Sequence, residues 1–175
     1  MRCGKILSLR ILGGVVLICL ASAIAEAAGP KDLGTFKGWS ALLLVENKAK
    51  ICYIHGVPGK SAGKYKKRGD TYLQVTHRTQ PKIRNEVSVT AGYNYRKGNR
   101  VTLAIDAKKF FLFTQADTAW SGDVNTDNKV VAAMRAGRSM IARGTSSRGT
   151  LTTDTYSLSG FTAAHRAISK ACGLK

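Results

Sequence analysis

The chain has 175 residues, of which 44% are hydrophobic and 22% are charged, and it carries 28 lysines and arginines against 10 aspartates and glutamates. It contains no internal repeat at the periods that mark solenoids or propellers and no low-complexity tract, which excludes a repeat architecture. The formal net charge of +18 predicts a surface that attracts polyanions and anionic membranes.

Residues 1–28 have the pattern of a secretory signal peptide. A basic start is followed by an apolar run over 11–20 and then by small residues. Two overlapping small-x-small patterns between Ala23 and Ala27 place cleavage between residues 25 and 28, without choosing a site. A membrane anchor is the alternative, but the apolar run is shorter than the roughly 20 residues that span a bilayer. We therefore expect an exported protein with no transmembrane segment in its mature part.

The mature part, residues 29–175, is expected to form a single domain. Its length of about 147 residues is enough to bury roughly two thirds of the unfolded surface in one core. Loss of residues 1–28 removes three basic residues and one acidic residue, which leaves 25 against 9 and a net charge of +16. The polyanions within reach of an exported protein are lipopolysaccharide, anionic lipid or host glycosaminoglycan. Nucleic acid is the least natural partner there, and no specific nucleic-acid site is predicted.

Two cysteines, Cys52 and Cys172, remain in the mature part, because Cys3 and Cys19 lie in the signal peptide. An even pair in an oxidising compartment predicts one disulfide bond, and two separate buried thiols are the alternative. In the chain-entropy model, a bridge that closes nearly the whole domain stabilises it by about 4 to 5 kcal/mol, less any strain.

The N-terminal half of the mature chain is predicted to form strands. A short polar lead over 31–35 precedes an apolar and aromatic strand over 36–45 and a second strand over 49–55. Polar and apolar residues then alternate over 71–77 and 86–93, which predicts two half-buried strands.

Two further strands and a β-hairpin follow. Alternating apolar residues predict a strand over 100–105, and a tight turn leads to another over 109–115. Residues 110–113 of that strand are apolar on both faces, so we expect it to be central and covered on each side. The segment from Ala133 to Phe161 predicts the end of a helix and then a hairpin whose turn lies at 146–149.

Two helices are predicted, the second at the C-terminus. The first covers 127–136, with Thr126 or Asp127 as its N-cap and Gly137 at its end. The second has Ser159 as a candidate N-cap, and its apolar stripe consists of Phe161, Ala164, Ile168 and Cys172. About eight short strands with two short helices predict a mainly β fold, either a β-sandwich or a barrel, with an open α+β sheet as the alternative.

A basic loop is the best candidate for a binding site. Residues 56–69 are rich in glycine and lysine, which is typical of a mobile surface loop, and their basic side chains cluster around Tyr65. The charges can hold phosphates or sulfates while the ring stacks or lies at a membrane interface. A solvated loop that binds nothing in particular is the alternative. With arginines of the hairpin, the predicted anionic-surface site comprises Lys60, Lys64, Lys66, Lys67, Arg68, Arg143 and Arg148.

No catalytic or metal-binding set is recognised. Cys52 and His55 have a C-x-x-H spacing, but residues three apart on a strand point to opposite faces, and further ligands are missing. Ser146 and Ser147 lie in a turn that itself favours serine, and no G-x-S-x-G elbow occurs. Asp154 lies among threonines of a strand and is expected to pair with a neighbouring arginine. We therefore expect no enzyme activity, no metal and no cofactor.

Several segments carry a family pattern. They are EVSVTAGY at 86–93, the strand pair from Ile105 to Phe113, Ala119-Trp120 and, above all, residues 133–164. Together with Cys52 and the basic, glycine-containing loop after it, these segments resemble the invasion-associated locus B family of exported alphaproteobacterial proteins. The resemblance covers most of the mature chain, weakly before Tyr72.

The resemblance implies an immunoglobulin-like β-sandwich without enzymatic activity. The residues it marks as fold determinants are Trp120, Arg148, Gly149, Asp154, Tyr156 and Phe161. Some family members take part in invasion of host cells, but others occur in bacteria that invade nothing, so invasion does not follow from the fold. We expect an exported, invasion-associated envelope or surface protein that is periplasmic, outer-membrane-associated or secreted, with a basic face for anionic surfaces or host cells and a link to virulence. The alternative is a structural periplasmic protein that binds another envelope protein.

Overall fold

The computed structural model describes residues 29–174, so the predicted signal peptide over 1–28 lies outside the described residues. Within this range the chain forms eleven strands and two helices. The strands are β1 (Lys31–Phe36), β2 (Trp39–Glu46), β3 (Ala49–Gly56), β4 (Lys60–Gly63), β5 (Tyr72–Arg78), β6 (Ile83–Thr90), β7 (Arg100–Ile105), β8 (Lys108–Gln115), β9 (Thr118–Trp120), β10 (Ser139–Thr145) and β11 (Leu151–Ser157); the helices are α1 (Val124–Ala136) and α2 (Phe161–Ala171).

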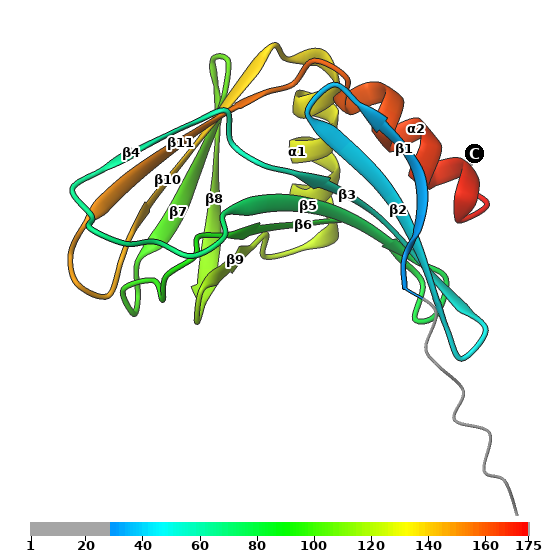
Figure 1. The fold of residues 1–175 in the computed structure, drawn as a ribbon, viewed down its shortest axis with the longest axis horizontal. Coiled ribbons are helices and arrows are strands. Elements are labelled where there is room, and N and C mark those ends of the chain that lie inside the picture. Colours follow the sequence, from blue (N-terminus) through cyan, green and yellow to red (C-terminus); the bar gives the residue numbers. More distant parts are fainter. Residues whose placement is uncertain (1–28, 175) are drawn as a thin grey trace, which may run out of the picture.

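The strands form one antiparallel sheet in the order β1-β2-β3-β5-β6-β9-β8-β7-β10-β11-β4. The sheet bends strongly near the short strand β9, so that β5 and β6 run across the view while β7 and β8 run steeply (Figure 1). Because of this bend, β2 and β11 meet although they are the second and the tenth strands in the order. The Trp39 and Tyr156 rings stack with their centroids 6.4 Å apart, and Trp39 Nε1 donates a 2.9 Å hydrogen bond to the Ser157 carbonyl. The two halves of the sheet are thus packed as a sandwich.

One hydrophobic core fills the space between the two halves of the sheet. Alternation along each strand places one set of side chains inside, as the sequence predicts. Leu73 and Val75 enter the core from β5, while Leu103 and Met140 enter it from β7 and β10. Full burial of such a side chain stabilises the fold by roughly 1.5 to 3 kcal/mol.

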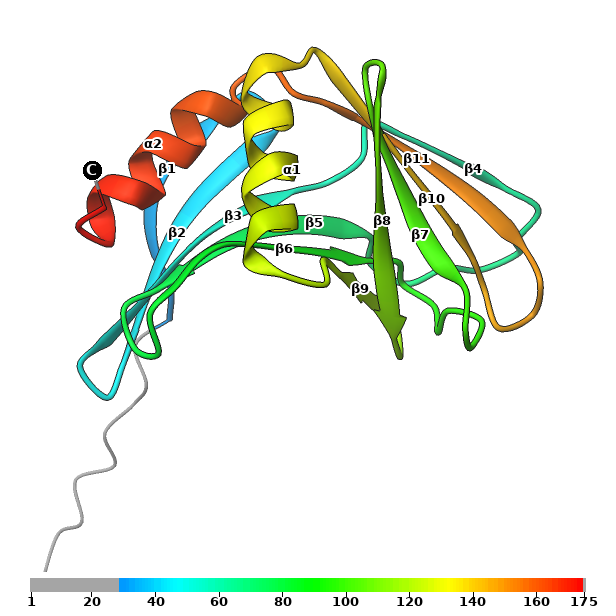
Figure 2. The same ribbon diagram turned by 180° about the vertical axis from the view of Figure 1, so that it is seen from behind.

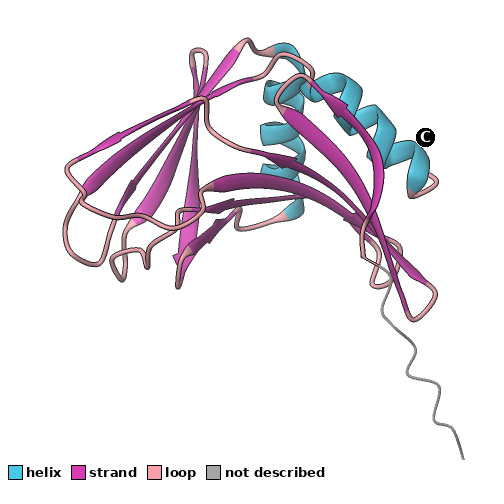
Figure 3. Cartoon of the chain, viewed as in Figure 1, coloured by secondary structure: helices cyan, strands magenta, loops and turns pink. Residues whose placement is uncertain are grey.

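Both helices lie against the half of the sheet that contains β1, β2, β3, β5 and β6, as Figure 2 shows from behind. The predicted stripe of α2 is confirmed, because Phe161, Ala164 and Ile168 are completely buried. The predicted N-cap at Ser159 is wrong: Gly160 caps α2 in a left-handed conformation, where a side chain would collide with the Phe36 carbonyl. A mainly β fold with immunoglobulin-like sandwich packing and two helices, the second at the C-terminus, is confirmed (Figure 3).

Helix α1 begins three residues earlier than the sequence predicts. Asp123 is its N-cap and accepts a 2.9 Å hydrogen bond from the Thr126 amide, so neither predicted cap is correct. Asp127 is instead buried in the first turn, where it accepts hydrogen bonds from the Val87 amide and the Ser121 hydroxyl. Burial raises the pKa of the Asp127 carboxyl, although both hydrogen bonds favour its charged form. This side chain connects α1 to β6.

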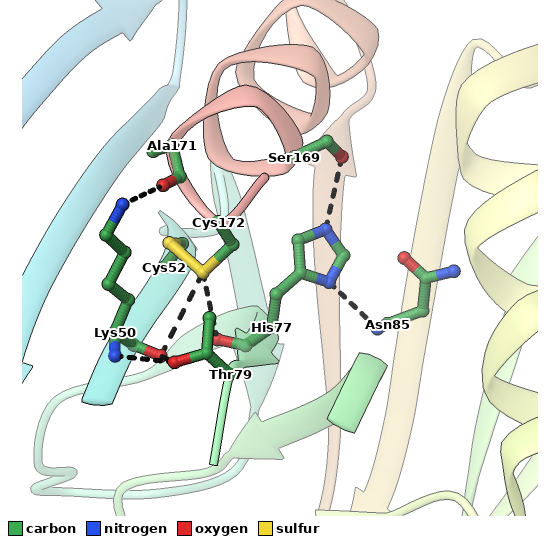
Figure 4. Close-up of a disulfide and its surroundings, with 8 residues drawn as sticks. All are labelled: Lys50, Cys52, His77, Thr79, Asn85, Ser169, Ala171 and Cys172. Carbon is green, nitrogen blue, oxygen red and sulfur yellow. Dashed lines mark hydrogen bonds between the residues drawn. A yellow bond between two sulfur atoms is a disulfide. The ribbon is translucent and has the colours of Figure 1, made fainter. Parts of the chain in front are cut away.

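The predicted disulfide bond between Cys52 and Cys172 is confirmed. It joins β3 to the C-terminal end of α2, with a Cα–Cα distance of 6.0 Å across 120 residues of sequence. Figure 4 shows the bridge between Lys50 and His77. Lys50 Nζ donates a 3.2 Å hydrogen bond to the Ala171 carbonyl, where a cation complements the C-terminal end of the helix dipole.

Three predictions about the strands are wrong. The polar lead over 31–35 belongs to β1, which pairs with β2, and β4 forms inside the predicted mobile loop. The expectation that both faces of β8 are covered also fails. Leu112 is buried in the core, but Phe111 and Phe113 on the opposite face are about half exposed, because the sheet has a core on one side only at this point.

No helix within 29–174 is long and apolar enough to cross a membrane.

Candidate functional site

A cleft of about 640 Å³ opens at one end of the sandwich. One wall is the loop that follows β4, the base is the connection after β6, and the other wall is the turn between β10 and β11. Figure 1 shows the first of these loops leaving β4 at one edge of the sheet and crossing to β5 in the other half. We call this the basic cleft and define it by residues 64–69, 92–94, 146–148, 150 and 152.

Cationic side chains dominate the wall of the basic cleft. Lys64, Lys66 and Lys67 come from the loop and Arg148 from the turn, and all four are exposed. Arg96 adds a fifth cation beside the turn, since its guanidinium lies against Gly149. Among the described residues, no aspartate or glutamate lines the cleft. The positive charges therefore face one another across the opening without a neutralising carboxylate.

Arg68 lies beneath the basic cleft and forms a buried ion pair with Asp154. Nη1 and Nη2 each approach a carboxylate oxygen to 2.7 Å, Nε donates a 2.6 Å hydrogen bond to the Ala91 carbonyl, and the two side chains are only 6% and 5% exposed. Burial lowers the pKa of Arg68, but the hydrogen bonds and charge of Asp154 raise it by more, so that the guanidinium stays charged. An ion pair between Asp154 and an arginine is thus confirmed, but the partner is Arg68, which is 86 residues away in sequence, and not a neighbouring arginine. Its charge is used inside the protein, so Arg68 is not available to an external anion.

Hydrogen bonds hold the base of the cleft to the wall that β11 and the turn before it form. The Tyr93 hydroxyl lies 2.6 Å from Thr152 Oγ1, and the Ser147 amide donates a 2.8 Å bond to the carbonyl of Asn94. Burial raises the pKa of the Tyr93 hydroxyl, which therefore stays protonated at neutral pH. These contacts make the cleft a fixed feature of the fold.

The loop is fixed to the base of the cleft by two glycines. The Gly69 amide donates a 2.9 Å hydrogen bond to the Gly92 carbonyl. Gly92 has a φ of +69°, and a Cβ there would collide with the Gly69 carbonyl. Only glycine permits this close approach between the chain before β5 and the chain after β6.

The serines of the turn have structural contacts. Ser146 Oγ accepts a 3.1 Å hydrogen bond from the Thr150 amide, and the Ser146 carbonyl accepts a 2.8 Å bond from the Gly149 amide. This is the turn chemistry that the sequence predicts at 146–149.

Within residues 29–174, no group of three or more histidine, cysteine, aspartate or glutamate residues is close enough to hold a metal ion.

The predicted anionic-surface set is divided between two faces. Lys60 pairs with Thr155 on the edge of the sheet, and Arg143 lies between Thr102 and Thr153 on a strand whose alternate residues are buried. Both side chains therefore lie on the outer face and do not line the cleft. The sequence predictions missed Asn94 as a part of the cleft, although the glycine and tyrosine that end the segment at 86–93 marked this connection.

Comparisons with known proteins concern the whole domain. The family model described as invasion associated locus B (IalB) protein matches residues 39–169. No curated protein sequence matches the chain. Among solved structures, the chain is similar to the crystal structure of invasion associated protein B from Bartonella henselae, with a TM-score of 0.56 and 16% sequence identity over 82% of this chain and 97% of that chain. At this identity the structural likeness shows the fold alone.

Proposed function

Because the chain belongs to the invasion associated locus B family, we propose that it is an envelope protein without enzymatic activity whose basic cleft binds anionic groups on an extracytoplasmic surface. The membership confirms the resemblance found in the sequence. One observation favours an anionic ligand. The cations of the cleft, which has a volume of about 640 Å³, are Lys64, Lys66, Lys67 and Arg148, and no carboxylate among the described residues lines it.

The physical case for an anion rests on charge that the protein does not neutralise itself. Asp154, the carboxylate beneath the cleft, is already bound by both terminal nitrogens of Arg68. A phosphate or sulfate in the cleft therefore meets lysine and arginine charges without competition from that carboxylate. Lipopolysaccharide, anionic lipid and host glycosaminoglycan all carry such groups outside the cytoplasm. Attraction between exposed charges falls as ionic strength rises, which makes salt the natural probe.

The family and the disulfide bond support an extracytoplasmic location. Disulfides persist in oxidising compartments such as the periplasm and the cell surface, and Cys52–Cys172 joins two distant parts of this domain. A periplasmic, outer-membrane-associated or secreted location is therefore part of the proposal. Contact with host cells, and through it a link to virulence, is proposed from the family description alone.

Replacement of Lys64, Lys66 and Lys67 by alanine tests the proposed site. Each lysine near an anionic surface contributes about 1 kcal/mol, so we expect binding to heparin to weaken about 100-fold and elution to move to lower salt. The matched control removes the same charge elsewhere, at the exposed residues Lys108, Lys109 and Lys129.

The control variant should elute close to the wild-type protein. Equal shifts for the two triple variants would mean that net charge, and not the basic cleft, governs binding, and the proposed site would then be rejected. Circular dichroism of both variants establishes that the fold is retained.

A further inference from the structure

We propose that the rim of the basic cleft docks on an anionic phospholipid bilayer, with Leu151 and Tyr65 entering its interfacial region. This inference rests on the proposed function and names the surface that the cleft contacts. Tyr65 lines the cleft, and Leu151 lies beside it in a groove that it shares with Lys64 and Arg148. Leu151 is 58% exposed and Tyr65 is 38% exposed, so apolar surface accompanies the charge at this end of the molecule.

The position of Leu151 is the first part of the argument. It begins β11 with its side chain on the outer face, since the next residue, Thr152, is buried. A shallow surface groove brings Leu151 together with Lys64 and Arg148. An exposed leucine between two cations adds nothing to the binding of a hydrophilic polyanion. It matches a bilayer, where the cations reach phosphate groups and the apolar side chain leaves water.

Tyr65 forms the second apolar part of the rim, close to Leu151. Both residues lie next to Gly63. A Cβ built on this glycine would be 2.9 Å from the Leu151 carbonyl oxygen and 3.0 Å from the Tyr65 ring. The guanidinium of Arg68 lies 5.6 Å from the centre of the Tyr65 ring and supports it from the buried side. Tyrosine with one apolar face and one polar end suits the interface between lipid and water.

Charge and shape select the bilayer as the occupant. Lys64, Lys66, Lys67 and Arg148 are all exposed at this rim, and no carboxylate lines the described cleft beside them. The loop after β4 and the turn between β10 and β11 project at the same end of the sandwich (Figures 1 and 3). A flat anionic surface can therefore contact both loops at once, with the cleft open to one lipid headgroup.

The test measures co-sedimentation of the mature, oxidised protein with vesicles of phosphatidylcholine, with and without phosphatidylglycerol. The variant is Leu151→Ser, and its control is Val45→Ser, because Val45 is 57% exposed at the far end of β2. We expect the wild-type protein to bind only vesicles that contain phosphatidylglycerol. Leu151→Ser should reduce this partition about tenfold, the scale set by removing a buried leucine side chain, while Val45→Ser leaves it unchanged.

The outcomes separate this inference from the proposed function. Leu151→Ser retains the charges of the cleft, so its elution from heparin should equal that of the wild-type protein. If Leu151→Ser and Val45→Ser sediment alike, or if phosphatidylcholine alone suffices, docking on an anionic bilayer is overturned even when heparin binding depends on the lysines. A Leu151→Trp variant gives a second readout. Brominated phosphatidylglycerol should quench its fluorescence beyond that of the wild-type protein, and equal quenching contradicts insertion.

Discussion

Arg68 determines where the lysines of the basic cleft lie. Its side chain reaches from the loop after β4 into the core, where it binds the Asp154 carboxylate with both terminal nitrogens and the Ala91 carbonyl through Nε. The guanidinium also lies 5.1 Å from the centre of the Tyr93 ring. One buried cation thereby fixes a segment whose neighbouring cations, Lys66 and Lys67, remain exposed. Basic residues thus have two different roles within three positions of sequence.

Arg68→Ala should lower the free energy of unfolding by about 3 to 5 kcal/mol, because it leaves the Asp154 carboxylate buried without its counterion. The double variant Arg68→Ala with Asp154→Ala should lose much less than the sum of the two single variants. Urea unfolding of the four proteins measures this coupling. Arg148→Ala, an exposed arginine of the same cleft, serves as the control and should change stability by at most about 0.5 kcal/mol. Additive effects at Arg68 and Asp154 would contradict the assigned ion pair.

His77 and His165 connect the three elements β5, β6 and α2 through a hydrogen-bond chain. The Asn85 amide donates to His77 Nδ1 at 3.0 Å, His77 Nε2 lies 3.2 Å from Ser169 Oγ, and His165 Nε2 lies 2.8 Å from Asn85 Oδ1. Figure 4 shows His77 between Asn85 and Ser169. Since the Asn85 amide occupies Nδ1 as a donor, a proton on that nitrogen would face a second donor. The arrangement therefore requires His77 to be neutral.

The histidine pair should make the protein less stable in mild acid. Burial is the main cause that lowers the pKa of each ring to about 4. Neighbouring positive charge contributes to this lowering, from His165 and Arg84 at His77 and from Arg135 at His165. Between the unfolded pKa of about 6.5 and this folded value, the unfolded chain binds more protons. The stabilisation is therefore complete above pH 6.5 and is lost as pH falls toward 4, by about 3 kcal/mol for the fully buried His77 ring and by less for the partly exposed His165 ring.

Urea unfolding at a series of pH values from neutral to mildly acidic measures this loss. The variant that carries both His77→Gln and His165→Gln should have a flatter pH profile than the wild-type protein, because glutamine does not titrate. His55→Gln is the control, since His55 lies in β3 outside this hydrogen-bond chain and contacts Tyr72. An unchanged slope in the double variant would show that other groups cause the acid sensitivity.

At the scale of elements, the sequence predicts those structures whose side chains have a regular burial pattern. Strand β7 and the stripe of α2 are correct because apolar residues recur with periods of two and of about 3.6. Strand β4 has no such pattern. All four of its residues are exposed, and it exists because its backbone pairs with β11, from Ala62 opposite Thr153 to Lys60 opposite Thr155. A strand held by backbone hydrogen bonds alone leaves no periodic signal in its sequence.

The same limit applies to the candidate site. Each of its basic segments is recognisable from composition, and Lys64, Lys67 and Arg148 line the same cleft. Their meeting depends on the pairing of β4 with β11, which is non-local. Arg68, unlike the lysines, is buried because it pairs with Asp154, which lies 86 residues away in sequence. Local composition does not distinguish a buried arginine from the exposed lysines around it.

At the scale of the whole molecule, binding and stabilisation lie at different ends. The basic cleft lies beside β4 and the turn between β10 and β11, whereas α2 and the C-terminus lie on the other side of the sandwich (Figure 1). The disulfide bond and the histidine pair both belong to the side of α2. A change at this side should therefore alter the stability of the fold without altering the affinity of the cleft for anions, as long as the protein remains folded.

Loss of the disulfide bond tests this separation. The bond closes 120 residues of sequence, so in the chain-entropy model its removal should lower the free energy of unfolding by about 4 to 5 kcal/mol, less any strain. Urea unfolding of a variant with Cys52→Ala and Cys172→Ala measures the loss, and the mass of the native protein should lie two hydrogens below that of the reduced protein. In dilute buffer, where the variant is still folded, its salt elution from heparin should equal that of the wild-type protein, because neither sulfur lies near the cleft. If the variant is as stable as the wild-type protein, the disulfide bond does not stabilise the fold by closing the chain. If a folded variant binds heparin more weakly, the affinity of the cleft is not independent of the end that holds the disulfide bond.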